Sequence, residues 1–317
     1  LPPLPLAFLE GLDQRDAWRS HGGHWTLERS GATPAAFSQI VPTVQVLPPR
    51  GSALRIQMAA GDSSLCDVGW SGDTELLPRR RLRTKGVLTD VDHLQLRHPA
   101  RRWRLRLTAL GGEPWRWRWG LASVTWRGRG RHALWCTPPP MDRRVAIRVP
   151  SASQMAEGGR DGSQACSPTS IQMLLAHRGI RLSVPEVMRT TWDPLAKIYG
   201  NWQKAIEAAW RHRCPGALVF FRHWGQVLGC LKAGVPLAAS IKFPRGKVDL
   251  PGAPIGHSGG HLIVIRGLTP EGDVLVNDSA AQTISAVPRS YPLVPLSRAW
   301  FGFSGMGYLI FAPKRRK

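Results

Sequence analysis

Residues 166–177 read Cys166-Ser-Pro-Thr-Ser-Ile-Gln-Met-Leu-Leu-Ala-His177. The apolar residues of this stretch recur at helical spacing, and Gly179 follows at the point where a helix would end. Pro168 is compatible with a first helical turn, because the N–H that proline lacks would have no partner there. The stretch therefore predicts a helix that begins at Cys166.

A cysteine at a helix N-terminus lies beside unpaired backbone N–H groups and the positive end of the helix dipole, and both favour an anion. The pKa of the Cys166 thiol would be lowered there, and the thiolate is the nucleophilic form. The alternative is a buried, inert cysteine that begins a helix. Cys166 is thus a candidate nucleophile.

A candidate base and its partner lie further along the chain. The segment Gly259-Gly-His261-Leu-Ile-Val-Ile265 places His261 at the start of an apolar strand, and a second strand ends at Asp278. A hairpin through residues 269–272 would bring Asp278 beside one nitrogen of His261, leaving the other nitrogen for the thiol. The alternative is a capping histidine and an aspartate that bonds its own turn. His257 is a competing base, although it lies in a Gly/Pro-rich loop.

The remaining C-terminal half combines helices with a later run of strands. Helical patterns occupy residues 201–210 and 226–232, and strand-like segments follow at 235–243, 261–265, 274–276 and 308–311. This order predicts an α+β fold.

The N-terminal half has a strand pattern. Residues 102–107 alternate apolar and basic side chains, and residues 115–119 alternate Trp with Arg. We expect an antiparallel, sandwich-like or barrel-like β domain with a tryptophan-rich inner face. The same alternation could instead present stacking surfaces to bases or sugars. Because three prolines at 138–140 end this pattern, we predict domains at 1–145 and 146–317.

The composition is that of a globular chain with a large positive charge. Of 317 residues, 43% are hydrophobic, 20% are charged, and the formal net charge is +22. An anionic envelope polymer is one possible partner of the basic N-terminal half, but no specific nucleic-acid motif accompanies the charge. The arginine-rich composition of a GC-rich genome is the alternative explanation. Because no apolar run approaches about 18 residues, we expect no transmembrane segment.

The five cysteines lie at positions 66, 136, 166, 214 and 230, without a CxxC pair. This spacing argues against a zinc ribbon or a thioredoxin-type site. Two disulfides plus one reactive thiol would suit an exported enzyme. Four buried free thiols beside Cys166 are the alternative.

These motifs together resemble a known family. Residues from about 150 to 313 resemble the papain-superfamily group related to the bacteriocin-processing, double-glycine-leader peptidases, in its stand-alone secreted form. The matching segments are Ser153-Gln-Met155, Cys166-Ser-Pro-Thr-Ser170, Gly200-Asn-Trp202, Gly259 through His261 and Val264 to Gly267, and Val276-Asn-Asp-Ser-Ala280. The resemblance implies a papain-like fold, a Cys166–His261–Asp278 triad without metal or cofactor, and a secreted or envelope location. The opening residues lack a signal-peptide pattern.

The resemblance also implies an oxyanion donor and a shaped cleft. The donor would be a glutamine upstream of the cysteine, and we assign this role to Gln154, which lies twelve residues before Cys166. That spacing is longer than in relatives, and a loop at residues 158–162 would have to compensate. Gln164 is too near, and Ala165 replaces a bulky aromatic residue. Asn201 and Trp202 are expected to shape the helix start and the cleft.

The expected reaction is hydrolysis of a peptide or protein substrate through a thioester. Transglutaminase- or amidase-type acyl transfer on the same triad is one alternative. A non-catalytic module that binds a glycan or an anionic envelope polymer through the Arg/Trp-rich sheet is another.

Overall fold

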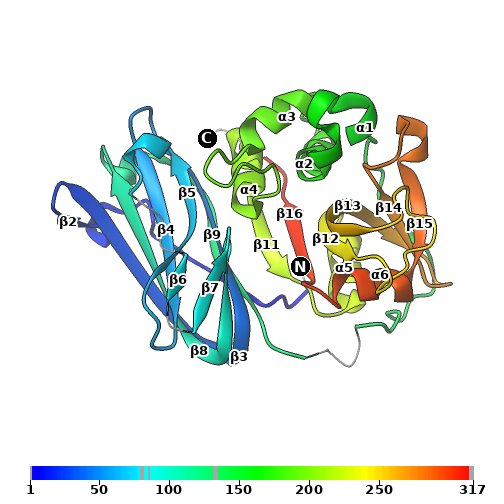
Figure 1. Ribbon diagram of the computed structural model, residues 1–317, viewed down its shortest axis with the longest axis horizontal. Coiled ribbons are helices and arrows are strands. Elements are labelled where there is room, and N and C mark those ends of the chain that lie inside the picture. The colour runs from blue at the N-terminus through cyan, green and yellow to red at the C-terminus, as the bar shows by residue number, and fades with distance from the viewer. Residues whose placement is uncertain (1, 79–81, 85, 131–134, 314–317) are drawn as a thin grey trace.

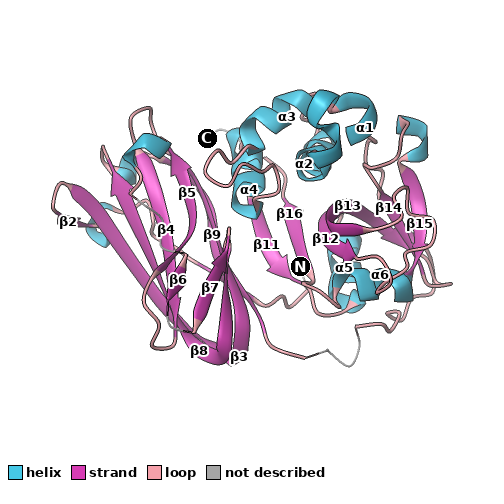
Figure 2. Cartoon of the chain, viewed as in Figure 1, coloured by secondary structure: helices cyan, strands magenta, loops and turns pink. Residues whose placement is uncertain are grey.

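The computed structural model describes residues 2–78, 82–84, 86–130 and 135–313 and contains two antiparallel sheets (Figure 1). Within these residues, every strand up to Arg127 belongs to the first sheet, and every strand from Val145 onward belongs to the second. The α-helices lie beside the second sheet (Figure 2). The chain is therefore mixed α/β, and among the described residues its α-helices are confined to the C-terminal part.

The first sheet has nine strands within the described residues, in the order β1-β9-β3-β8-β4-β5, with β2 on β3 and the β6–β7 hairpin on β8. Short 3-10 helices join some of them: η1 (Arg15–Ala17), η2 (Thr74–Leu76) and η3 (Pro114–Arg116). The strands are β1 (Leu6–Phe8), β2 (Arg19–His21), β3 (His24–Leu47), β4 (Ala53–Ala60), β5 (Cys66–Gly72), β6 (Arg83–Thr84), β7 (Val87–Asp90), β8 (His93–Leu110) and β9 (Arg118–Arg127).

The alternation predicted for residues 102–107 is present in β8. Trp103, Leu105 and Leu107 are buried, whereas the arginines between them point away from the core. Trp103 pairs with Gly31 across the β3–β8 ladder, and a Cβ on that glycine would lie 2.6 Å from the indole ring. The glycine therefore makes room for the tryptophan that closes this part of the core.

The two layers expected for a sandwich are joined in one sheet. The first half of β3 pairs with β8 and its second half with β9, and the β3–β8 register shifts between Ala32 and Phe37. Such irregularities bend strands, so one long strand serves both parts of the sheet.

The prediction of a strand at residues 115–119 is wrong for the first half of that segment. Residues 114–116 form the 3-10 helix η3, and β9 begins only at Arg118. Pro114 suits the start of a 3-10 turn, and the chain must reverse direction here to place Trp119 opposite Val46. The Trp119 indole donates to the carbonyl of Pro114 at 2.7 Å, which fixes the reversal.

The second sheet has seven strands within the described residues, in the order β11-β16-β12-β13-β14-β15, with β10 on β13. The strands are β10 (Val145–Ala146), β11 (Gly216–Phe220), β12 (Leu237–Phe243), β13 (Ser258–Leu268), β14 (Asp273–Asn277), β15 (Pro288–Pro292) and β16 (Met306–Ile310). The helices are α1 (Gln154–Glu157), η4 (Gly159–Gln164), α2 (Cys166–His177), α3 (Val184–Thr191), α4 (Trp202–Arg211), α5 (Trp224–Lys232), η5 (Ile284–Ala286) and α6 (Leu293–Trp300).

Each face of this sheet has its own core. Side chains of α2, α3 and α4 pack with Leu218 and Val264 on one face, and those of α5 and α6 pack with Val219 and Ile263 on the other. Successive strand residues point to opposite faces, which explains why neighbouring residues join different cores. Within the described residues, no helix is long and apolar enough to cross a membrane.

The two sheets meet along the edge of β11. This strand pairs with β16 along one edge. Along its other edge, where no further strand pairs with it among the described residues, its backbone N–H groups donate to side chains of the first sheet. These bonds run from Gly216 N–H to Gln45 Oε1 (2.9 Å), from Leu218 N–H to Thr43 Oγ1 (3.0 Å) and from Phe220 N–H to Thr125 Oγ1 (3.1 Å). Because buried backbone groups require partners, the first sheet completes the second.

All five cysteines are free, so the prediction of two disulfides is wrong for this structure. Cys66, Cys214 and Cys230 are buried, as expected if the cysteines other than Cys166 are buried free thiols, whereas Cys136 is partly exposed.

Candidate active site

Cys166 is the first residue of α2, so the predicted helix begins where expected. The first turn is closed by Thr169, whose backbone N–H and Oγ1 both donate to the carbonyl of Ala165 at 3.0 and 2.7 Å. Backbone N–H groups of Ser167 and Leu262 are among the neighbours that lower the pKa of the Cys166 thiol. Cys166 as a residue is partly exposed to solvent.

The predicted hairpin is formed by β13 and β14. Val264 pairs with Asn277 and Leu268 with Val274. The turn is closed by the Gly272 N–H, which donates to Thr269 O at 3.2 Å. Residues 261 and 278 consequently leave the same end of the hairpin.

The structure brings Cys166, His261 and Asp278 together. His261 Nε2 lies 2.7 Å from Asp278 Oδ1, and both side chains are buried. This contact leaves Nδ1 of the imidazole available to the Cys166 thiol, and His261 and Cys166 each shift the pKa of the other. The competing base His257 is exposed, and His261 holds the position beside Asp278.

The pKa values of all three groups are shifted by their neighbours. Burial by itself raises the pKa of the Cys166 thiol, but hydrogen bonding and charge attraction from His261 outweigh it, so the pKa is lowered. Burial likewise opposes charge on His261, yet Asp278 and the thiol raise its pKa to about 10. The pKa of Asp278 is lowered against burial, chiefly by His261. The shifts of Cys166 and His261 act in the same sense, because each makes the charged form of its group less costly.

Two other cysteines show what burial does without such a partner. Burial raises the pKa of Cys214 to about 11 and that of Cys230 to about 12. Cys166 differs from them by the helix N-terminus and the imidazole beside it. The contrast identifies these neighbours, rather than exposure, as the cause of the lowered pKa.

Tyr291 is a site residue that the sequence analysis missed. Its hydroxyl donates to Asp278 Oδ2 at 2.5 Å, and the Ala280 N–H donates to Oδ1 at 3.0 Å. Tyr291 is fully buried in β15, next to β14 in the sheet. With His261, these donors satisfy both carboxylate oxygens and hold Asp278 in one orientation. The only sequence signal is a tyrosine between prolines, which does not predict such a contact.

Gln154 is buried at the start of α1, and its side chain is fully engaged. The amide nitrogen donates to Gly162 O at 3.0 Å and Ser163 O at 3.4 Å, while Oε1 accepts from the Ser279 hydroxyl at 2.7 Å. These bonds tie the η4 segment to the loop that carries Asp278. The amide donors thus point at η4 carbonyls in this structure, and the oxyanion role of Gln154 stays a prediction.

Asn201 and Trp202 lie at the start of α4. Asn201 caps this helix by accepting from the Lys204 N–H at 3.2 Å, and its amide donates to Asp193 at 2.6 Å. The Trp202 N–H donates to Asp92 Oδ2 at 2.7 Å. Asp92 lies between β7 and β8, so the first sheet supplies an anion at this helix N-terminus. The expected role of the pair in shaping a cleft stays a prediction.

One comparison with known proteins matches the C-terminal half of the chain to a protein family. The family model described as Peptidase_C39 like family matches residues 146–308, which is just over half of the chain. A comparison with curated protein sequences gave no match.

Three solved structures are similar at low identity. A Bacillus anthracis protein described as a C39-like peptidase is 15% identical, covers 56% of this chain and all of its own, and has a TM-score of 0.41. A double glycine motif protease from an AMS/PCAT transporter, solved with the leader peptide, is 16% identical over 55% of this chain and all of its own (TM-score 0.36). The peptidase domain of Streptococcus ComA is 13% identical over 48% of this chain and 93% of its own (TM-score 0.35).

The assignment rests on the family model and on its match across the segment that carries α2, β13 and β14. The chain belongs to the C39-like family of cysteine peptidases, whose fold is papain-like.

Proposed function

We propose that this peptidase hydrolyses peptide bonds with Cys166 as nucleophile, His261 as general acid and base, and Asp278 as the residue that orients His261. The observation that carries the proposal is the 2.7 Å contact between His261 Nε2 and Asp278 Oδ1, which leaves Nδ1 for a thiol at the start of α2. This arrangement gives each of the three groups a separate task.

In the first half of the reaction, the Cys166 thiolate attacks the carbonyl carbon of the substrate. Negative charge on the carbonyl oxygen is stabilised at the N-terminus of α2, where the first backbone N–H groups have no intrahelical acceptor. The imidazolium of His261 then donates its Nδ1 proton to the leaving nitrogen as the C–N bond breaks. A thioester remains on Cys166 and the amine product departs.

In the second half, neutral His261 removes a proton from water, and the resulting hydroxide attacks the thioester carbonyl. The C–S bond breaks, the product leaves as a carboxylic acid, and the thiolate–imidazolium pair is restored. Asp278 keeps Nε2 of His261 protonated throughout, which directs the exchanging proton to Nδ1.

The test is mass spectrometry of a diverse peptide mixture after incubation with the full chain and an added primary amine. We expect new C-termini that end in free carboxylates, and we expect Cys166→Ala to abolish them. Cys136→Ala, which removes a partly exposed thiol outside the site, is the matched control and should leave cleavage unchanged. Products that contain the added amine would instead support the acyl-transfer alternative. Cleavage that survives Cys166→Ala would refute the proposal.

We also propose that residues 1–145 and 146–317 are separate domains and that the enzyme is secreted or held at the cell envelope. The division of strands between two sheets supports a boundary between Arg127, where β9 ends, and Val145, where β10 of the second sheet begins one residue before the proposed division. The location is supported by the family resemblance, whereas the five free thiols give it no support. An anionic polymer as partner of the first sheet stays a prediction from charge. Immunoblotting of fractionated native cells tests the location.

A further inference from the structure

An arginine lies beside the buried tyrosine that contacts the site. Arg289 and Tyr291 are both in β15, the strand at the end of the second sheet next to β14 (Figure 1). Arg289 pairs with Val276 and Tyr291 with Val274, so the two side chains leave β15 on the same face. Arg289 is therefore the neighbour along the strand of the tyrosine whose hydroxyl donates to Asp278 Oδ2 at 2.5 Å.

The Arg289 guanidinium is held from two sides. One terminal nitrogen, Nη1, donates to the carbonyl of Gly252 at 2.6 Å, and the other, Nη2, donates to the carbonyl of Ala286 at 2.5 Å. Gly252 lies in the segment between β12 and β13 that leads to His261, and Ala286 ends η5, which follows Asp278. Because the guanidinium is planar and rigid, these two bonds fix its position between the segments next to two residues of the site.

A third donor of Arg289 is buried. Within the described residues, Nε has no hydrogen-bond partner, and none of the ion pairs includes Arg289. Burial and the Asp278 carboxylate raise the pKa of Tyr291, whereas the charge and hydrogen bonding of Arg289 act in the opposite direction. The half-buried guanidinium therefore acts on the same hydroxyl that holds Asp278.

We infer that Arg289 is a positioning residue of the peptidase site, which acts on His261 through Tyr291 and Asp278. This inference rests on the proposed triad. A cation beside the Tyr291 oxygen polarises the O–H bond and strengthens its donation to Asp278, because hydrogen bonds in a chain reinforce one another. A firmly held carboxylate keeps its 2.7 Å contact with His261 Nε2 and supports the imidazolium, which in turn supports the Cys166 thiolate.

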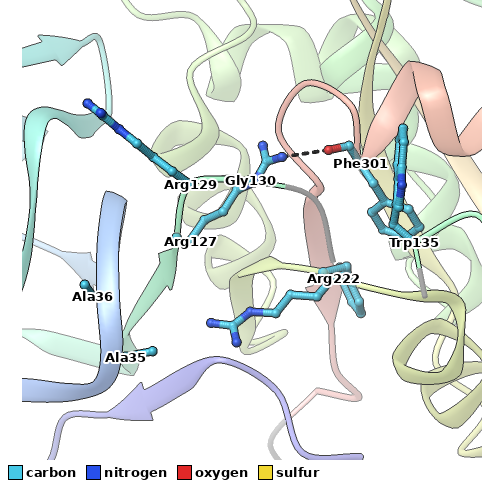
Figure 3. Close-up of a pocket in the computed structure, with 10 residues that line it drawn as sticks. Ala35, Ala36, Arg127, Arg129, Gly130, Trp135, Arg222 and Phe301 are labelled. Atoms are coloured by element: carbon cyan, nitrogen blue, oxygen red, sulfur yellow. Dashed lines mark hydrogen bonds between the residues drawn. The ribbon is translucent and has the colours of Figure 1, made fainter. Parts of the chain in front are cut away.

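A purely structural tether is the competing explanation, and Arg127 provides a matched case. Its guanidinium also donates to two main-chain carbonyls, those of Phe301, at 2.7 Å, and Phe303 (Figure 3). These bonds join the end of β9 to the segment after α6, and neither of them reaches β13, β14 or β15. Replacing Arg127 thus removes the same kind of tether without changing the surroundings of Tyr291.

The rate of Cys166 alkylation in the native full chain at pH 6, followed by mass spectrometry with iodoacetamide, tests the inference. We expect Arg289→Gln to slow labelling about threefold, because the Tyr291 hydroxyl becomes a weaker donor to Asp278. Arg127→Gln should label Cys166 at the wild-type rate, even if urea titration shows a similar loss of stability. Arg289→Lys should be slowed nearly as much as Arg289→Gln, since an ammonium keeps the charge but lacks the fork that holds it in place.

A double variant tests the route through Tyr291. If Arg289 acts through that hydroxyl, adding Arg289→Gln to Tyr291→Phe should cause no further slowing. Independent slowing in the double variant, a wild-type rate in Arg289→Gln or Arg289→Lys, or equal slowing in Arg127→Gln would overturn the inference. His261→Ala separates the two proposals. Slowing in His261→Ala but not in Arg289→Gln rejects this inference alone, whereas an unchanged rate in His261→Ala rejects the triad as well.

Discussion

Replacing Tyr291 by Phe tests whether the buried carboxylate at the site depends on its hydroxyl partner. The substitution removes one donor to Asp278 Oδ2 and leaves that oxygen buried, because both residues are fully buried. A hydrogen bond to a charged group contributes about 1.5–3 kcal/mol, so we expect the free energy of unfolding at pH 7 to fall by about 2 kcal/mol. With a urea m-value of about 3 kcal/mol/M, the midpoint would fall by roughly 0.7 M.

The loss should depend on pH, and its sign follows from the lowered pKa of Asp278. Stabilisation by this carboxylate is present above the pKa of an unfolded aspartate, about 3.9, and is lost as the pH falls through the lower folded value. Removing a donor moves the folded pKa back upward. The difference in unfolding free energy between Tyr291→Phe and wild type should therefore be largest above about pH 5 and shrink in acid.

Urea titrations of both proteins between pH 3 and pH 7 give the measurement. Tyr199→Phe is a matched control, because the Tyr199 hydroxyl also donates to a carboxylate, that of Asp161 at 3.1 Å, but does so at the surface. Tyr199→Phe should lower the free energy of unfolding by less than about 0.5 kcal/mol, since water replaces the lost partner. An equal cost for the two substitutions, or a cost for Tyr291→Phe that does not change with pH, would refute the reasoning.

Two further substitutions test the contacts around the site. Thr43→Val keeps the side-chain shape but leaves the Leu218 N–H at the β11 edge without its 3.0 Å acceptor. We expect the free energy of unfolding to fall by about 1–3 kcal/mol. Thr26→Val is the control and should change it little, because the Thr26 hydroxyl bonds at an exposed position of the first sheet. Denaturant titration measures both, and equal stability of Thr43→Val and wild type would show that the first sheet does not complete β11. Gln154→Ala should lower the unfolding free energy by about 1–3 kcal/mol, because the Ser279 hydroxyl and an η4 carbonyl lose their partner. A variant that keeps its stability but loses kcat by about a hundredfold would instead support the oxyanion role.

The parts of the site that could be predicted are those with local signals. Pro168 in a first helical turn indicated where α2 begins, and the turn at residues 269–272 indicated the hairpin that brings residues 261 and 278 to one end. Each signal involves residues close in sequence, whose backbone preferences act without the rest of the fold.

Some features had local signals that were not used. Ser183 and Glu186 form a capping box at the start of α3, and this spacing is readable in the sequence, yet no helix was predicted there. The alternation of Trp with Arg at residues 115–119 indicated a strand, whereas Pro114 favoured the 3-10 turn that the structure has there. A two-residue period over so short a stretch does not separate a strand from a turn.

Other features depend on contacts between distant segments and have no local signal. Tyr291 meets Asp278 only because β15 pairs with β14, and the prolines at both ends of β15 argue against a strand. Thr43 and Gln45 bond to the β11 edge across more than a hundred residues of chain. Such contacts follow from the packing of the two sheets, which residue patterns alone do not determine.

The central claim is that His261 holds Cys166 as a thiolate, and the rate of Cys166 alkylation as a function of pH tests it most directly. The native full chain is treated with iodoacetamide from pH 5 to pH 9, and labelling of Cys166 and of the partly exposed Cys136 is followed by mass spectrometry. We predict rapid native labelling of Cys166 already at pH 6, well below the ordinary thiol pKa of about 8.5, and slowing by at least about tenfold in His261→Ala. Labelling of Cys166 that requires denaturation, or the same pH profile in wild type and His261→Ala, would contradict the account.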